Sequence, residues 1–129
     1  MEREIDTRSF RRYDLEGGWI VLVGKTDADN DELSLRFREP EDVWFHVADV
    51  PGSHVLLLQR EGEEPRRPIL HAAAAIAAWH SKGRKAKKIG VSMTKAKNVS
   101  KRRGAPRGQV LVKNSDVIRV VPGLPETET

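Results

Sequence analysis

The stretch DVWFHVADVPGSHV, residues 42–55, decides the fold that this sequence predicts. Over residues 43–48 every second side chain is apolar, a period of two that is typical of a half-buried strand. Pro51 and Gly52 then interrupt the run, because proline presets φ and glycine accepts the positive φ of a turn. Residues 54–58 (HVLLL) have the composition of a returning strand. The stretch therefore predicts an antiparallel β-hairpin.

The tip of this hairpin gathers polar side chains that could carry chemistry. If residues 50–53 form the turn, Asp49 and His54 become cross-strand neighbours. His46 and Ser53 then lie close to them. A type II turn twists a hairpin against its preferred hand, so the register depends on this choice of turn residues.

The flanking sequence adds further strands and one long helix. Alanine has the highest helix propensity, and residues 69–82 (ILHAAAAIAAWHSK) are rich in it. Ile69, Ala72, Ile76 and Trp79 form an apolar stripe along this helix. Strand-like patterns cover residues 10–15, 19–23, 43–48, 54–58, 88–94, 109–112 and 117–121.

A short helix is a further option at residues 26–37, where Thr26 or Asp27 provides a cap, although residues 32–38 also alternate as a strand does. The prediction is a single α+β domain over residues 10–121. It consists of a mostly antiparallel sheet of about six strands with one long alanine-rich helix packed on it. Residues 1–9 are predicted to be a flexible N-terminus and residues 122–129 a disordered tail.

Composition excludes several functional classes. The 129 residues contain no cysteine, which excludes disulfides, thiolate catalysis and cysteine-ligated metal. No apolar run follows Met1, and the longest apolar stretch, residues 69–79, is too short to cross a bilayer. We therefore expect a cytoplasmic protein with no membrane partner, and nothing in the sequence indicates a cofactor.

The charges are distributed unevenly along the chain. Residues 1–64 carry 8 basic and 16 acidic side chains, whereas residues 65–115 carry 14 basic side chains and no acidic one. Mixed charges would serve solubility equally well, so a segment without carboxylates indicates a binding site for a polyanion. The expected phosphate contacts are Lys82, Arg84, Lys88, Lys95, Lys97, Lys101 and Arg102. A solvated basic loop is the alternative, and no amphipathic helix with a large apolar face supports membrane binding.

The tip residues leave several interpretations open. Ser53 could act as a nucleophile beside a histidine, although it lacks the strand-to-helix elbow of a hydrolase serine. His46, Asp49 and His54 could bind a metal, but their spacing matches no specific pattern. Asp49 and Ser53 could instead satisfy backbone groups of the turn. In a nucleic-acid interface, the histidines and Trp44 would offer ring faces to bases, and turn amides would hold phosphate.

The sequence resembles the NFACT-R domain, the C-terminal part of ribosome quality-control proteins also described as fibronectin-binding. The resemblance covers residues 10–121. The hairpin stretch is its most specific part, and the segments VLVGK and NDEL precede it. Further matching positions are Gly18, Trp19, Ser81, Lys82, Arg84, Lys88, Val91, Thr94, Lys97, Val99, Lys101 and Gly108.

The resemblance implies an RNA-binding domain without catalytic activity of its own. Its relatives bind the large ribosomal subunit and tRNA and support C-terminal tailing of stalled chains. They do so with an N-terminal domain, a helix-hairpin-helix and a coiled coil that this sequence lacks, so we expect a stand-alone module. At Ala48 the chain departs from the basic residue that the family often has. The implied site residues are Trp44, His46, Asp49, Pro51, Gly52, Ser53 and His54.

The function predicted from the sequence is non-enzymatic binding of structured RNA such as tRNA or rRNA. The ribosome is a further expected partner, and DNA is not excluded. One alternative is an RNA-processing enzyme that uses His46, Asp49 and His54 for metal or acid/base chemistry. The other is a module that docks on a ribosomal protein. The main prediction requires that the carboxylate-free segment form one positive surface beside the hairpin.

Overall fold

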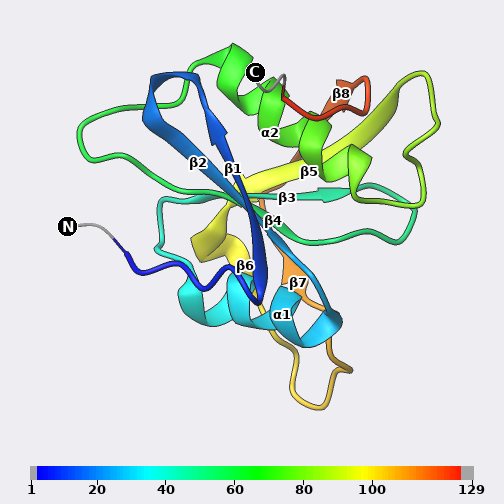
Figure 1. Ribbon diagram of the computed structural model, residues 1–129. Coiled ribbons are helices and arrows are strands. Elements are labelled where there is room, and N and C mark those ends of the chain that lie inside the picture. The colour runs from blue at the N-terminus through cyan, green and yellow to red at the C-terminus, as the bar shows by residue number, and fades with distance from the viewer. Residues whose placement is uncertain (1–2, 126–129) are drawn as a thin grey trace.

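Two hairpins from the N-terminal half form the centre and one edge of the sheet (Figure 1). The computed structural model describes residues 3–125. β1 (Phe10–Leu15) and β2 (Trp19–Gly24) pair across the turn Glu16–Gly18. β3 (Val43–Val47) pairs with β4 (Val55–Leu57), so the hairpin predicted from residues 42–55 is confirmed.

The six-stranded sheet has the order β1-β2-β4-β3-β5-β8, and all its neighbouring strands are antiparallel. Together with its helices it confirms the predicted α+β fold. The predicted strand at 109–112 joins a separate two-stranded sheet instead. The remaining elements are α1 (Asp27–Asp31), η2 (Glu32–Phe37), α2 (Arg67–Trp79), β5 (Ile89–Lys95), η3 (Ala96–Asn98), β6 (Val99–Ser100), β7 (Leu111–Val112) and β8 (Asp116–Val120).

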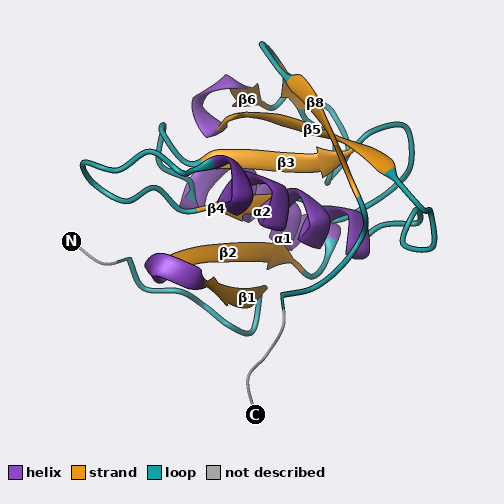
Figure 2. Cartoon of the chain, turned by 90° about the horizontal axis from the view of Figure 1, so that it is seen from above, coloured by secondary structure: helices purple, strands orange, loops and turns teal. Residues whose placement is uncertain are grey.

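The alanine-rich helix α2 covers one face of the sheet (Figures 1 and 2). Ala73, Ile76 and Ala77 are fully buried against apolar side chains of the sheet. The predicted stripe is only partly right, because Trp79 at its end is half-buried rather than in the core. Small alanines bring the helix backbone close to the strands. The helix ends at Trp79.

Helices α1 and η2, with the β6–β7 ribbon, cover part of the opposite face. The short helix is confirmed, since the Thr26 hydroxyl caps it by accepting the N–H of Asp29 at 3.1 Å. Residues 32–37 form the helix η2, which excludes the strand alternative, and Leu33 is buried on this side. β2 is consequently covered on both faces, as its continuous apolar run predicts.

The start of the described chain is tied to the sheet. Arg3 makes two 2.8 Å hydrogen bonds to the carboxylate of Asp42, which has no exposed surface. The flexibility predicted for residues 1–9 and the disorder predicted for residues 122–129 stay predictions, and residues 1–2 and 126–129 lie outside the described part. Within residues 3–125, none of the helices combines the length and the apolar character needed to span a bilayer.

Candidate nucleic-acid interface

The register of the central hairpin differs from the predicted one. Val43 lies opposite Leu57 and Phe45 opposite Val55, which leaves residues 48–54 as a wide loop. The predicted pairing of Asp49 with His54 is therefore wrong. Asp49 is an exposed loop residue with φ 66°, in the left-handed region that aspartate tolerates better than most residues. We call residues 48–54 the tip loop.

The tip loop pairs with the chain that follows α2, which explains why it does not close as a tight turn. Gly52 and Ser81 form an antiparallel bridge. The N–H of Ser53 donates to the carbonyl oxygen of His80 at 3.0 Å, and that of Lys82 donates to Pro51 O at 2.9 Å. These bonds place the start of the basic segment 82–88 directly beside the tip loop.

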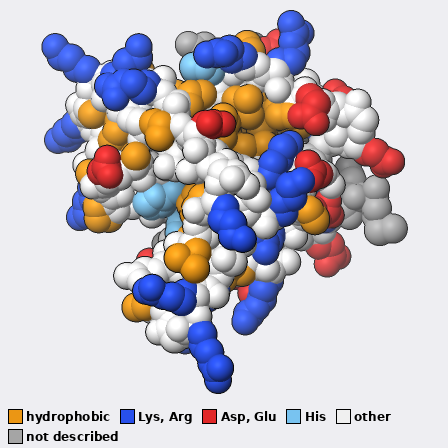
Figure 3. Space-filling view, turned by 180° about the vertical axis from the view of Figure 1, so that it is seen from behind, with side chains coloured by type: hydrophobic (Ala, Val, Ile, Leu, Met, Phe, Trp, Pro, Cys, Tyr) orange, Lys and Arg blue, Asp and Glu red, His pale blue; other side chains and the backbone are white. Residues whose placement is uncertain are grey.

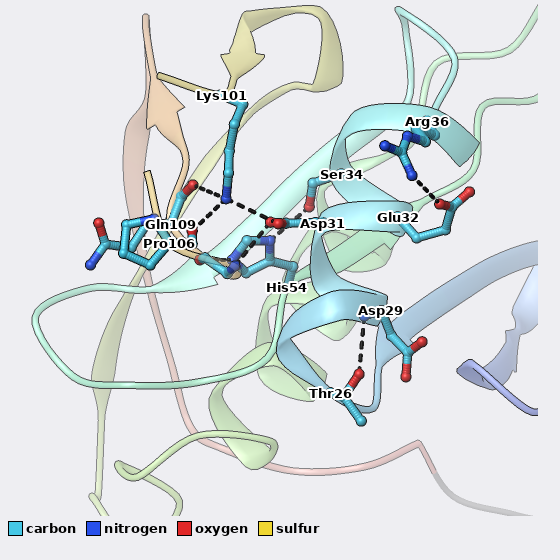
Figure 4. A network of polar contacts seen from close by, with 11 residues as sticks. Thr26, Asp29, Asp31, Glu32, Ser34, Arg36, His54, Lys101, Pro106 and Gln109 are labelled. Carbon is cyan, nitrogen blue, oxygen red and sulfur yellow. Dashed lines mark hydrogen bonds and ion pairs between the residues drawn. The ribbon is translucent and has the colours of Figure 1, made fainter. Parts of the chain in front are cut away.

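A chain of hydrogen bonds runs from the core to the far side of the tip. The indole Nε1–H of Trp44 donates to Ser34 Oγ at 2.8 Å, and Ser34 Oγ lies 2.7 Å from Nδ1 of His54. His54 Nε2 lies 3.1 Å from the carbonyl oxygen of Gly108, which can only accept. The proton of a neutral His54 therefore resides on Nε2, and the Ser34 hydroxyl donates to Nδ1. Figure 4 shows Ser34 and His54 side by side.

Burial determines the charge of both tip histidines. Burial and the nearby His46 lower the pKa of His54 to about 4, although its bond to Gly108 acts in the opposite direction. Burial also lowers the pKa of His46, whose Nε2 lies 3.2 Å from Gly52 O. Both rings are therefore neutral at pH 7.

The aromatic residues of the site do not all have an open face. Trp44 is 2% exposed and His54 is 3% exposed, because α1, η2 and residues 101–109 cover them. The structure thus corrects the expectation that Trp44 and His54 offer ring faces to bases. Their hydrogen bonds instead join the tip to η2 and to Gly108. His46 is half-buried and keeps part of its surface in solvent.

The basic loop at residues 101–109 is anchored on the other side of the tip. Asp31 accepts the N–H of Gly108 at 3.0 Å and the Nζ of Lys101 at 3.0 Å. Lys101 also donates to the carbonyl oxygens of Pro106 and Gln109, so its ammonium closes the loop internally (Figure 4). This loop therefore holds a fixed position next to His54.

The structure divides the predicted basic residues into two groups. Lys95 and Lys97 contact the carboxylate of Glu41, with Nζ–Oε distances of 3.6 and 2.8 Å. They lie away from the tip, since Lys95 pairs with the first residue of β3. Among residues 3–125, no ion pair involves the cations of residues 82–88 or, apart from Lys101, those of the loop 101–107: Lys82, Arg84, Lys85, Lys87, Lys88, Arg102, Arg103 and Arg107.

The cations without an ion pair therefore fall in two parts of the carboxylate-free segment, residues 82–88 and 102–107. Each part adjoins a residue that is hydrogen-bonded to the tip loop, through Lys82 and Gly108. Figure 3 views the molecule from behind. Lys and Arg side chains lie on the upper part of this view and on the part that projects at the bottom, and a histidine lies between them. The Cζ atom of Arg84 lies 4.5 Å from the ring centroid of Trp79, and its Nε–H donates to Trp79 O at 2.8 Å.

The catalytic alternatives gain no support from the geometry. In the described part of the chain, no hydrogen bond joins the Ser53 side chain to a histidine, which a hydrolase triad requires. Within residues 3–125, no three His, Asp or Glu side chains lie close enough together to hold a metal ion. His46, Asp49 and His54 are thus not arranged as a metal site.

Three residues of the α1–η2 segment support the tip without standing out in the sequence. Ser34 links Trp44 to His54, Asn30 accepts the backbone N–H of His54 at 3.1 Å, and Asp31 fixes the loop 101–109. Polar residues at helical spacing normally face solvent, so only the burial of Asn30 and Ser34 identifies them.

Three comparisons place the chain among known proteins. Its similarity to the family described as "NFACT protein RNA binding domain" extends over residues 9–114. It is 36% identical to the "Rqc2 homolog RqcH" of Streptococcus suis over 83% of this chain and 19% of that protein. It is 32% identical to the "Coiled-coil domain-containing protein 25 homolog" of Dictyostelium discoideum over 80% of this chain and 52% of the relative.

A solved structure shows the same architecture. The C-terminal part of the fibronectin/fibrinogen-binding protein from Streptococcus suis superimposes with a TM-score of 0.83 and 33% identity. The superposition covers 95% of this chain and 49% of that one. The chain thus spans about half or less of the length of these relatives. With the family's pattern matched over most of its residues, the chain belongs to the NFACT protein RNA binding domain family.

Proposed function

We propose that this protein binds structured RNA, such as tRNA or rRNA, without catalysing a reaction on it. The phosphate contacts come from the segment 82–88 and the loop 101–107, and the tip loop lies between them. One observation carries this proposal: the cations beside the tip are free of ion pairs within residues 3–125, whereas Lys95, Lys97 and Lys101 contact carboxylates.

The arrangement suits a phosphate chain for two reasons. An exposed cation without a carboxylate partner gains more from a phosphate than one whose charge is already neutralised. Both basic segments are also fixed to the tip loop by hydrogen bonds, through the N–H of Lys82 to Pro51 O and through Gly108 O to His54, so little ordering is needed on binding. Backbone contacts of this kind confer affinity with little sequence preference.

The relatives extend the proposal to a cellular role. Because matched relatives are Rqc2 homologs, we infer that the chain works with the ribosome in the cytoplasm, in quality control or another branch of RNA metabolism. DNA presents similar phosphates, so a DNA duplex of equal length belongs in the same titrations. The 2′-hydroxyl is the group by which a protein distinguishes RNA.

Fluorescence anisotropy with a labelled tRNA across salt concentrations tests the proposal. Five phosphate contacts give a slope of log K against log salt of about −3.5 to −4.5. The double variant Lys85→Glu, Lys87→Glu is expected to weaken binding at least about tenfold, because two contacts become repulsive. Binding that ignores ionic strength, or no binding at low salt, contradicts the proposal.

The matched control is Arg66→Glu with Arg67→Glu, which changes the net charge equally. These arginines lie at the N-terminal end of α2, whereas the segment 82–88 follows its C-terminal end. The two ends of the helix are about 20 Å apart. Acidic residues suit a helix N-terminus, so this variant is expected to fold. Equal loss of affinity in both double variants would show that net charge, not the tip, governs binding.

A further inference from the structure

The sheet face opposite α2 has an uncovered patch beside the tip loop. His46 pairs with Ser92, and Ser92 pairs with Val117, so the three side chains form one row across β3, β5 and β8. Ser92 is half-buried, and Val117 is 62% exposed. We call this row and the next one the outer patch, whose members are His46, Ala48, Gly90, Ser92, Val117 and Arg119.

The second row of the outer patch is a low floor. The N–H of Ala48 donates to Gly90 O at 2.9 Å, and Gly90 pairs with Arg119. Gly90 has no side chain, and a Cβ placed there would lie 2.9 Å from Cγ1 of Val117 and 4.0 Å from the Cβ of Ala48. The Cγ1 methyl group of Val117 therefore covers Gly90. The low part of this row is the small, partly exposed side chain of Ala48, with the exposed apolar side chain of Val117 at its edge.

The rings of Trp44 and His46 are stacked along β3, and the stack leads toward Ala48. Their centroids lie 6.0 Å apart with an interplanar angle of 16°, so one face of His46 is turned to Trp44. The ring of His54 stands at 77° to the indole and 87° to His46, which places it beside the stack rather than on it. Alternate residues of a strand lie about 6.6 Å apart, so the next position of the stack is over Ala48, which carries no ring.

Cations border the open position. Arg119 ends the second row of the outer patch, and Lys88 directly precedes β5, which carries Gly90. Both side chains are exposed, and no ion pair involves either of them within residues 3–125. A flat aromatic group that carries a phosphate therefore finds a ring face, a small-residue floor and two cations at one place.

We propose that an unpaired nucleobase of the bound RNA stacks on the outer face of His46 and lies over Ala48. Its edge contacts Val117, and its phosphates reach Arg119 and Lys88. The inference rests on the proposed RNA binding and adds the class of RNA element: a loop, bulge or end with an unpaired base. Every base has a π face, so the stack tolerates any base.

Two RNA hairpins with the same stem test the stacking. One has a loop of unpaired uridines and the other has abasic nucleotides at the same positions, so that both carry equal numbers of phosphates. The protein is expected to bind the uridine loop about tenfold more tightly, within the range for one base on an aromatic ring. The variant Ala48→Leu fills the open position, and its affinities for the two hairpins are expected to be equal.

The controls separate stacking from phosphate binding. Ala28→Leu makes the same change on the exposed surface of α1 and should keep the tenfold preference. His46→Phe retains a ring face and keeps the preference, whereas His46→Ala loses it. Equal, salt-dependent affinities of the unchanged protein for both hairpins overturn the stacking site and leave the proposed function standing. A preference that survives Ala48→Leu also overturns the site, and binding of neither hairpin overturns both proposals.

Discussion

Lys82 donates its backbone N–H to the carbonyl oxygen of Pro51 at 2.9 Å, across 31 positions of the chain. The bond belongs to a short antiparallel contact in which Gly52 faces Ser81. Through it, a loop that follows β3 and a basic segment that follows α2 become one surface. The placement of the charges beside the tip thus depends on the close approach of two backbones.

Gly52→Ala is expected to disturb this contact. A Cβ at position 52 would lie 2.9 Å from the Cβ of Ser81 and 3.0 Å from Cγ1 of Val47, so one of the two must move. Overpacking of this kind costs about 1–3 kcal/mol of unfolding free energy. Urea unfolding measures the loss, and hydrogen exchange at the amide of Lys82 reports whether the pairing opens.

Gly123→Ala is the matched control, since its nearest heavy atom would lie 4.0 Å away. Its unfolding free energy should stay within about 0.5 kcal/mol of that of the unchanged protein. If both variants were equally stable and the amide of Lys82 kept its protection, the close contact would be unimportant for the tip.

Arg3→Ala tests whether the N-terminal segment is part of the fold. The carboxylate of Asp42 is fully buried and accepts N–H groups of Glu39 and Gln59, both at 2.7 Å, besides the guanidinium of Arg3. Removing the guanidinium leaves a buried charge without its counterion, which costs about 3 kcal/mol. Urea unfolding at pH 7 measures the difference.

Arg8→Ala provides the comparison, because the side chain of Arg8 is 92% exposed and its pairing with Asp6 is worth little in water. We expect its unfolding free energy to change by less than about 0.5 kcal/mol. Equal effects of Arg3→Ala and Arg8→Ala would instead support the flexible N-terminus that the sequence predicts.

Local patterns in the sequence were sufficient for the six strands of the main sheet and for the helices α1 and α2, whereas the short strand β6 was not predicted. The turn Glu16–Gly18 joins two strands that are consecutive in the chain. Thr26 caps its helix through Asp29, only three residues further on. The tip loop was not predictable in this way. Its partners are residues 80–82, and a Pro-Gly pair carries no information about a contact so distant in the chain.

The charge pattern had the same limit. The sequence shows that Lys97 and Lys101 lie in a segment without carboxylates, yet each contacts one from another part of the chain. Glu41 lies 56 positions from Lys97, and Asp31 lies 70 positions from Lys101. A count of charges along a segment therefore predicts the presence of a positive surface, but only the fold shows which of its cations are free.

The hydrogen-bonded position of His54 predicts a pH-dependent stability. Burial and the nearby His46 lower its pKa to about 4 in the folded protein, whereas an unfolded histidine has a pKa near 6.5. Between these values the unfolded chain binds more protons, so stability is full above pH 6.5 and is lost as the pH falls toward 4. When the pH falls from 7.5 to 5.5, His54 lowers the free energy of unfolding by about 1 kcal/mol.

Urea unfolding of the unchanged protein and of His54→Gln at these two pH values measures this contribution. Glutamine can still donate to Gly108 O and accept from Ser34, but it does not titrate. Burial also lowers the pKa of His80, to about 4, so part of the pH dependence should remain in the variant. We expect the variant to lose about 1 kcal/mol less than the unchanged protein. The same loss in both proteins would mean that His54 is not a neutral, buried link between Ser34 and Gly108.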